Sequence, residues 1–288
     1  MKQTSIFIAF FVLTVSYTAQ ALQQSQQSYY GSEFYSSILN QAKDEKLKLG
    51  LKKILKSGHI RAPGRPDQLV ESCDSIKNCS SQNSIGYSNA RKFLFGKFYL
   101  VKVDSGNYGI KEFYCDRVYQ NSDFGSGQRP GPGLVPDNNV INVEHTWPQS
   151  KFTGKYSKEM QKSDLHHLYP TDSQMNSIRG NHMFGEVERD GQHTKCSASR
   201  TGQGSAGGAT IFEPPNNHKG HVARAIFYFS VRYDIPIAPA EEVILKTWAE
   251  QFPVDAEESL RNDEIYKIQG NRNPFVDHPE LVKSITDF

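Results

Sequence analysis

The sequence predicts an α+β fold, in which a mostly helical domain with long loops surrounds a few short strands. Segments with apolar residues at helical spacing occupy both ends of the chain. Short runs rich in β-branched and aromatic residues lie near its middle, and loops rich in Gly, Pro and Ser separate them. No internal repeat or break in composition divides residues 22–288, so we expect one domain.

The first 21 residues are predicted to be a secretory signal peptide. Lys2 supplies the positive start, Ile6–Val15 the apolar centre, and Ala19 and Ala21 a cleavage site of small residues. An uncleaved membrane anchor is the alternative, but the apolar run is shorter than the roughly 20 residues that span a bilayer. We therefore expect a periplasmic or secreted chain that begins near Leu22 and has no membrane segment.

The elements expected in the rest of the chain follow from periodicity and composition. Helical spacing of apolar residues predicts helices over residues 32–57, 88–96, 220–233 and 240–252. Alternating or β-branched sequence predicts strands over residues 108–119 and 140–145. Turn-forming composition predicts loops over residues 125–139 and 197–209.

All four cysteines follow the predicted cleavage site, and an even number in an exported chain suggests two disulfides. Cys73 and Cys79 lie close together in a polar stretch, so a small local loop is their simplest pairing. That choice leaves Cys115 with Cys196 as a long-range bridge. Four cysteines allow three pairings, so this connectivity is a hypothesis, and free thiols are the alternative.

The formal net charge of +2 is only mildly basic, with 33 Lys and Arg against 31 Asp and Glu. Domains that bind nucleic acid usually carry a stronger basic balance. Any argument for nucleic-acid binding must therefore rest on the local arrangement of residues.

One segment near the middle of the chain combines acid–base and metal-binding residue types. Glu144 and His145 end the predicted 140–145 strand, where neighbouring side chains point to opposite faces, although a twist there could let both border one cleft. Residues 163–170 (SDLHHLYP) suit a second strand or extended loop. Asp172 is a natural N-cap for a helix to His182, which places Asn176 and Arg179 on one face.

The order of these segments resembles the endonuclease I family of bacterial periplasmic and secreted nucleases. The resemblance rests on "NVEHTWPQSKF", "SDLHHLYP", "MNSIRGN", "GHVARAIFYF" and "IQGNRNPFV", with "ARKFLFG" upstream. Together they run from about Tyr87 to Asp277. The resemblance implies a ββα-metal (His-Me finger) nuclease core over about residues 140–185.

The resemblance also implies roles for single residues. His145 matches the general base, and Glu144 and Asn176 match the ligands of one divalent cation, Mg²⁺ or an ion such as Mn²⁺ or Ca²⁺. Hard cations prefer carboxylate and amide oxygens, and an imidazole that titrates near neutrality can deprotonate water. The expected activity is cleavage of double- and single-stranded DNA by a monomer, without sequence preference and with 5′-phosphate products. Cleavage of RNA as well stays open.

The chain departs from the family pattern in one loop. Some members carry an arginine there that contacts the cleaved phosphate, whereas residues 151–162 contain none. Lys151, Lys155 and Arg179 are the candidate phosphate contacts, and an internal salt bridge is the alternative for Arg179. Asp164, His166 and His167 are expected to be structural or to orient the site.

Two other function classes remain open at this stage. A secreted zinc hydrolase could take its ligands from the histidines 145, 166, 167 and 182, but the sequence lacks HExxH and paired CxxC motifs. A secreted binding protein without enzymatic activity would leave these histidines as structural residues.

Overall fold

The computed structural model describes residues 28–38, 42–61, 65–104, 106–189, 191–193, 195–204 and 208–288. The predicted signal peptide, residues 1–21, lies outside these ranges. Within the described residues, no helix has the length and apolar character needed to cross a membrane.

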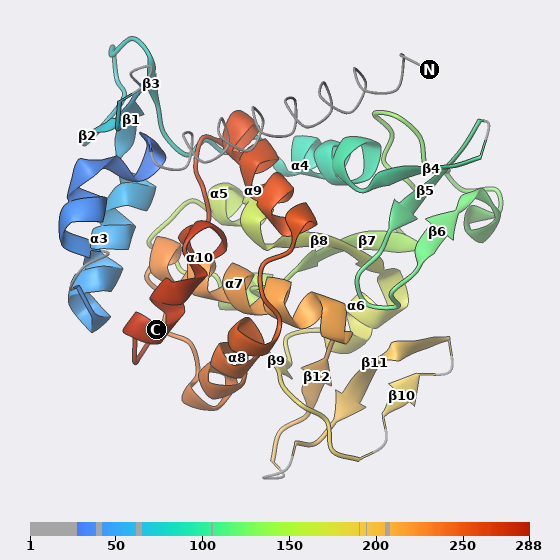
Figure 1. Ribbon diagram of the computed structural model, residues 1–288. Helices are drawn as coiled ribbons and strands as arrows, with labels where there is room; N and C mark the ends of the chain where they lie inside the picture. Colours follow the sequence, from blue (N-terminus) through green and yellow to red (C-terminus); the bar gives the residue numbers. More distant parts are fainter. Residues whose placement is uncertain are drawn as a thin grey trace, which may run out of the picture.

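The chain folds as helices around one central helix, with small sheets among and beside them (Figure 1). The α-helices are α3 (Asp44–Lys56), α4 (Tyr87–Phe93), α5 (Lys158–Ser163), α6 (Ser173–Arg179), α7 (Asn216–Tyr233), α8 (Pro239–Gln251), α9 (Ala256–Gln269) and α10 (Pro274–Asp277). The π-helical segments are η1 (Phe34–Ile38) and η2 (Leu94–Phe98). The 3₁₀ turns are η3 (Asn121–Phe124), η4 (Gln149–Lys151), η5 (Leu165–His167) and η6 (Pro279–Ser284).

The strands form four separate small sheets. The first has the order β2 (Gln68–Val70), β1 (Gly58–Ile60), β3 (Cys79–Ser80), and the second β4 (Leu100–Asp104), β5 (Asn107–Lys111), β6 (Val118–Gln120). The third pairs β7 (Ile141–His145) with β8 (Leu168–Asp172). The fourth has the order β10 (Gln192–His193), β11 (Cys196–Gly202), β12 (Ile211–Glu213), β9 (Met183–Phe184). A mixed fold of helices and small sheets is therefore confirmed.

Helix α7 forms the centre of the core. Every residue from His218 to Tyr233 is buried, as expected of a helix covered on all sides by other elements. Helices α3, α8 and α10 and the turn η5 pack against it. Gly220 permits the contact with the end of α8, because a Cβ there would collide with the carbonyl oxygen of Phe252.

The hairpin β7–β8 and helix α6 form a compact unit at the middle of the chain. The strands are antiparallel, with Glu144 opposite Tyr169 and His145 opposite Leu168. The Asp172 side chain caps α6 by accepting a hydrogen bond from the Met175 amide at 2.8 Å, as its sequence position predicted. Gly180, with φ of 52°, ends the helix, which is therefore shorter than the predicted span to His182.

Two other predicted elements are divided in the structure. The predicted strand 108–119 is the pair β5 and β6, because the chain turns at 112–117, where Asp116 has a φ of 52°. Residues 32–57 contain η1 and α3 rather than one described helix.

The prediction of a loop over residues 197–209 is wrong at its start. Residues up to Gly202 belong to β11, which pairs with β10 and β12. Ser199 is fully buried and its hydroxyl donates to the Tyr114 carbonyl oxygen at 2.7 Å. Tertiary contacts thus outweigh the loop-like Gly and Ser composition of this segment.

Both predicted disulfides are present. Cys73 pairs with Cys79 beside β3, and Cys115 pairs with Cys196 at the start of β11. The second bridge connects residues 81 positions apart and ties the fourth sheet to the segment after β5. No described cysteine is free.

Candidate active site

The Glu144 carboxylate is buried against helix α6, with 1% of the residue exposed. Its partner is the equally buried guanidinium of Arg179, which ion-pairs with it through Nη1. The same guanidinium donates to the carbonyl oxygens of His145 at 3.0 Å and Thr146 at 2.7 Å. Arg179 therefore holds both the acid and the backbone at the end of β7.

The charge state of Glu144 depends on two opposing effects. Burial raises the pKa of Glu144 to about 7, although the positive charge of Arg179 acts to lower it. Glu144 in turn adds to the effect of burial in raising the pKa of Tyr114 well above its usual range. The acid is therefore poised to change its charge near neutral pH when no cation is bound.

The Asn176 side chain lies against the same strand, one helical turn before Arg179. Its Nδ2 donates to Asn142 Oδ1 at 2.7 Å and to the Val143 carbonyl oxygen at 3.2 Å. Its Oδ1 accepts no hydrogen bond from the residues that the structure describes, and the residue is only partly buried. An amide oxygen without a donor, on a side chain that contacts the strand residue before the buried Glu144, fits the oxygen preference of a hard divalent cation.

His145 follows Glu144 in β7, and its side chain packs among a different set of residues. Its ring packs near Tyr87, Phe152 and His167, with ring centroids 5.4, 6.3 and 5.5 Å away. Nε2 lies 3.1 Å from the carbonyl oxygen of Lys162, which can only accept, so Nε2 carries the proton. The neutral ring therefore has its lone pair on Nδ1, where the exposed Gln149 side-chain amide is a weak donor at 3.4 Å.

The surroundings of His145 favour its neutral form. Burial lowers the pKa of His145 well below its usual value, and the neighbouring His167 would lower it further if charged. A neutral imidazole is the form that can accept a proton. His145 thus has the state that a general base requires.

Two residues beside His145 were not singled out from the sequence. Tyr87 starts α4 and packs on the imidazole, and the Lys162 ammonium lies 4.6 Å from the centre of the Tyr87 ring. Burial raises the pKa of Tyr87, so its hydroxyl stays protonated. The only sequence signal was its position at the edge of the "ARKFLFG" resemblance, since a lone tyrosine has no diagnostic spacing.

Asp164 is the centre of a buried polar network rather than part of the open site. It accepts hydrogen bonds from the side chains of Gln82 (2.8 Å), Tyr228 (2.7 Å), Tyr233 (2.8 Å) and Gln269 (2.7 Å) and from the His166 amide (3.1 Å). Burial acts to raise the pKa of Asp164, but His166, His167 and these donors lower it overall. The network joins the turn before β8 to α7 and α9.

The two adjacent histidines are both fully buried. His166 Nε2 donates to the carbonyl oxygen of Asn271 at 3.1 Å, and His167 Nε2 to that of Gln161 at 2.8 Å. Burial lowers the pKa of each to about 4, against the attraction of the Asp164 charge. His167 adjoins the His145 ring, and the orienting or structural roles of both histidines stay predictions.

The depressed pKa of His166 predicts a specific pH dependence. A histidine with a pKa near 6.5 in the unfolded chain and about 4 in the folded one costs stability as pH falls below 6.5. The variant His166→Gln keeps a donor for Asn271 but does not titrate. Its stability deficit, measured by urea unfolding, should therefore shrink by about 2 kcal/mol between pH 7 and pH 5. A deficit that is constant with pH would contradict a neutral buried His166.

The candidate phosphate-binding cations occupy different environments. Arg179 is buried in the ion pair with Glu144, which matches the salt-bridge alternative for this residue. Lys155 is exposed and lies 3.4 Å from Asp234. The Lys151 ammonium forms no ion pair or hydrogen bond with the described part of the chain and is exposed next to the end of β7. Lys151 is thus the lysine best placed to meet an anion.

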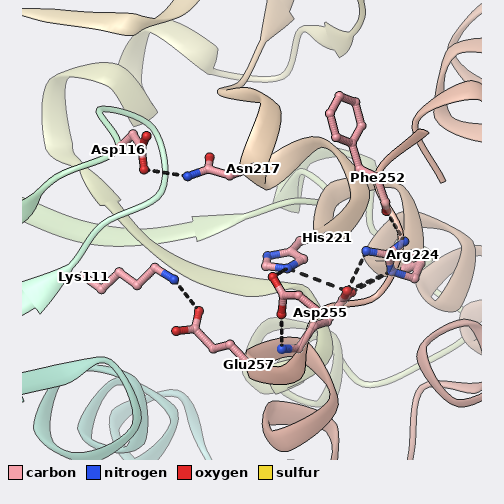
Figure 2. Close-up of polar contacts among 9 residues, drawn as sticks. Lys111, Asp116, Asn217, His221, Arg224, Phe252, Asp255 and Glu257 are labelled. Atoms are coloured by element: carbon pink, nitrogen blue, oxygen red, sulfur yellow. Dashed lines mark hydrogen bonds and ion pairs between the residues drawn. The ribbon is translucent and has the colours of Figure 1, made fainter. Parts of the chain in front are cut away.

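The polar residues of α7 are part of the core packing. Figure 2 shows His221 and Arg224 directed toward the loop and helix that follow α8. His221 Nε2 lies 3.2 Å from Asp255, and Arg224 Nη2 lies 2.6 Å from Glu258. Through these contacts the charged residues of α7 join the loop before α9 and α9 itself to the core.

The arrangement offers no support for a site of nitrogen ligands. The described residues contain no group of three or more His, Cys, Asp or Glu side chains placed to hold one metal ion. The Nε2 atoms of His145, His166 and His167 each face a backbone carbonyl oxygen. The candidate ligand atoms on β7 and α6 are the side-chain oxygens of Glu144 and Asn176 instead.

Comparison with known proteins connects this geometry to a family. The model of the Endonuclease I family matches residues 45–280, most of the chain. This protein belongs to the endonuclease I family. Both β7 and α6, with Glu144, His145 and Asn176, fall inside the match.

Among relatives of this endonuclease I family member, an "Extracellular ribonuclease" of Bacillus subtilis (strain 168) is 38% identical over 50% of this chain and 53% of its own. An "Endonuclease-1" of Buchnera aphidicola subsp. Acyrthosiphon pisum is 33% identical over 40% and 44%. A "Periplasmic deoxyribonuclease" of Aeromonas hydrophila is 30% identical over 40% and 48%. The chain matches only about half the length of these relatives.

Proposed function

We propose that this protein is an exported endonuclease that hydrolyses phosphodiester bonds of nucleic acids without sequence preference. The main support is the placement of His145, Glu144 and Asn176 around the end of β7, with His145 held as a neutral base. The family match gives independent support. The succession β7–β8–α6 is the order of a ββα-metal core, and we assign that core to about residues 140–185, inside one nuclease domain of residues 22–288.

In the proposed mechanism, His145 Nδ1 takes a proton from the attacking water. The water oxygen bonds to phosphorus and the P–O3′ bond breaks. The departing 3′ oxygen takes a proton from solvent water, which leaves a 3′-hydroxyl and a 5′-phosphate. The Lys162 carbonyl oxygen keeps Nε2 protonated and so presents the lone pair at Nδ1. Arg179 is a positioning residue in this scheme, because its guanidinium orients Glu144 and the backbone of His145.

Glu144 and the free Oδ1 of Asn176 are the residues that would hold a divalent cation, which we propose to be one Mg²⁺ ion. A bound Mg²⁺ would neutralise charge on the scissile phosphate and the leaving oxygen. The buried ion pair with Arg179 occupies one oxygen of Glu144 and keeps the acid aligned with α6. Asp164, His166 and His167 support the hairpin that carries these residues.

The substrate range we propose includes DNA and RNA. Relatives named as ribonucleases and as deoxyribonucleases both match this chain. Export agrees with the predicted signal peptide and with relatives named extracellular or periplasmic. Lys151 and Lys155 would meet the phosphates, and contacts of this kind carry no sequence information.

A cleavage assay on three substrates tests this function. Purified protein is incubated with supercoiled plasmid, single-stranded DNA and RNA, with Mg²⁺, with Zn²⁺ or with EDTA. We expect cleavage of all three in Mg²⁺, none in EDTA, and a loss of at least tenfold in Asn176→Ala at low Mg²⁺ that higher Mg²⁺ partly restores. Ser177→Ala, at an exposed neighbouring position of α6, is the matched control. Inert protein, or activity that depends on Zn²⁺ alone, would overturn the proposal.

A further inference from the structure

A pocket of about 220 Å³ opens beside the proposed site. Its apolar walls come from Trp147 and Pro148, directly after β7, from Ile226 of α7, and from Ile237 before α8. The volume is smaller than that of most sites for drug-sized ligands, which begin near 300 Å³. One planar ring system of the size of a nucleobase is a suitable occupant.

The pocket shares a wall with the residues of the proposed site. Thr146 lines it, and the Thr146 carbonyl oxygen is held by the guanidinium of Arg179 that pairs with Glu144. Glu241 also lines it and accepts a hydrogen bond at 2.9 Å from the amide of Phe184, whose ring contacts that guanidinium 4.4 Å from its centre. The pocket therefore lies on the side of β7 where Glu144 and α6 are.

Three polar groups of the pocket have capacity for a ligand. The Thr146 hydroxyl is fully buried and has no hydrogen-bond partner among the described residues. Glu241 accepts one hydrogen bond through Oε1, from the Phe184 amide, and burial raises the pKa of its carboxyl. Lys151 contributes an exposed ammonium that is close enough to act on Glu241 electrostatically. An unpaired buried hydroxyl costs free energy unless a ligand supplies its partner.

We propose that this pocket, between Trp147 and Glu241, binds one unpaired nucleobase of the substrate, next to the scissile phosphate. Lys151 would meet a phosphate of the same nucleotide, and Thr146 and Glu241 the polar edge of the base. This inference rests on the proposed function and adds a subsite to it. Because a base inside a duplex cannot enter such a pocket, the subsite favours single-stranded nucleic acid or locally opened duplex.

Binding of a mononucleotide without metal separates this subsite from catalysis. The probe is 2′-deoxyadenosine 5′-monophosphate in EDTA, titrated by calorimetry, and 2-deoxyribose 5-phosphate is the same ligand without its base. We expect the nucleotide to bind at least tenfold more tightly than the sugar phosphate. Ala238→Phe, which fills the pocket from an exposed lining position, should weaken nucleotide binding at least tenfold and leave sugar phosphate binding unchanged.

Ala240→Phe is the matched control, since Ala240 lies in the first turn of α8, is exposed and does not line the pocket. It should bind both ligands as the unaltered protein does. Equal affinity for both ligands, or full nucleotide binding by a folded Ala238→Phe variant, would overturn the pocket assignment. In that case the unaltered protein would still nick plasmid in a metal-dependent reaction. If the unaltered protein did not nick plasmid with any metal, the proposed function itself would be overturned.

Discussion

Replacing His145 with alanine is expected to lower the rate of phosphodiester cleavage by about 10²–10⁴-fold, the usual contribution of a general base. The loss should appear in kcat, because the imidazole acts on the water rather than on substrate binding. The measurement is initial-rate cleavage of single-stranded DNA in Mg²⁺ over a range of substrate concentrations. Added imidazole should restore part of the rate to the variant, since it can replace the missing base.

The control for this prediction is His193→Ala, in β10 of the peripheral fourth sheet, where the ring contacts Thr201 at 3.1 Å. That variant should cleave at close to the full rate. Circular dichroism of His145→Ala should retain the signal of the folded protein. A folded His145→Ala variant with an unchanged rate would remove His145 from the mechanism.

Replacing Arg179 with methionine is expected to destabilise the fold by about 3–5 kcal/mol, because it leaves the Glu144 charge buried without its partner. The variant also loses the donors to the carbonyl oxygens of His145 and Thr146. The measurement is urea unfolding in EDTA at pH 8. That pH lies above the raised pKa of Glu144, about 7, so the unpaired acid must either stay charged or take up a proton.

The double variant Glu144→Gln with Arg179→Met distinguishes this charge effect from lost packing. The double variant should lose less free energy of unfolding than Arg179→Met alone, because no buried charge remains. Arg200→Met removes a partly exposed ion pair with Glu213 and should cost less than about 1 kcal/mol. Additive losses in the double variant would contradict a buried ion pair as the cause.

The order of the site elements could be predicted from the sequence because each has a local signal. β-branched residues before Glu144 favour a strand, Asp172 is a side chain suited to cap a helix, and Gly180 ends that helix. The pairing of Cys115 with Cys196 followed from the short distance between the other two cysteines. Prediction was wrong at residues 197–202, where strand pairing with β10 and β12 outweighs local composition.

The contacts of the site could not be predicted in the same way. Helical spacing put Asn176 and Arg179 on one face, but it left both a phosphate contact and a salt bridge open for Arg179. In the structure Arg179 forms the ion pair, because Glu144 is buried under α6. Tyr87 and the carbonyl oxygen of Lys162 reach His145 from segments that no periodicity connects to it.

The sequence by itself determined which chemical groups this protein has and the order in which they occur, since strand, cap and helix signals act over a few residues. The tertiary structure alone decided which nitrogen of His145 is free, which acid Arg179 neutralises, and that a pocket lies beside Thr146. These features depend on burial and on contacts between distant segments. Burial changes the free energies of charges and hydrogen bonds by several kcal/mol, and no local pattern records it.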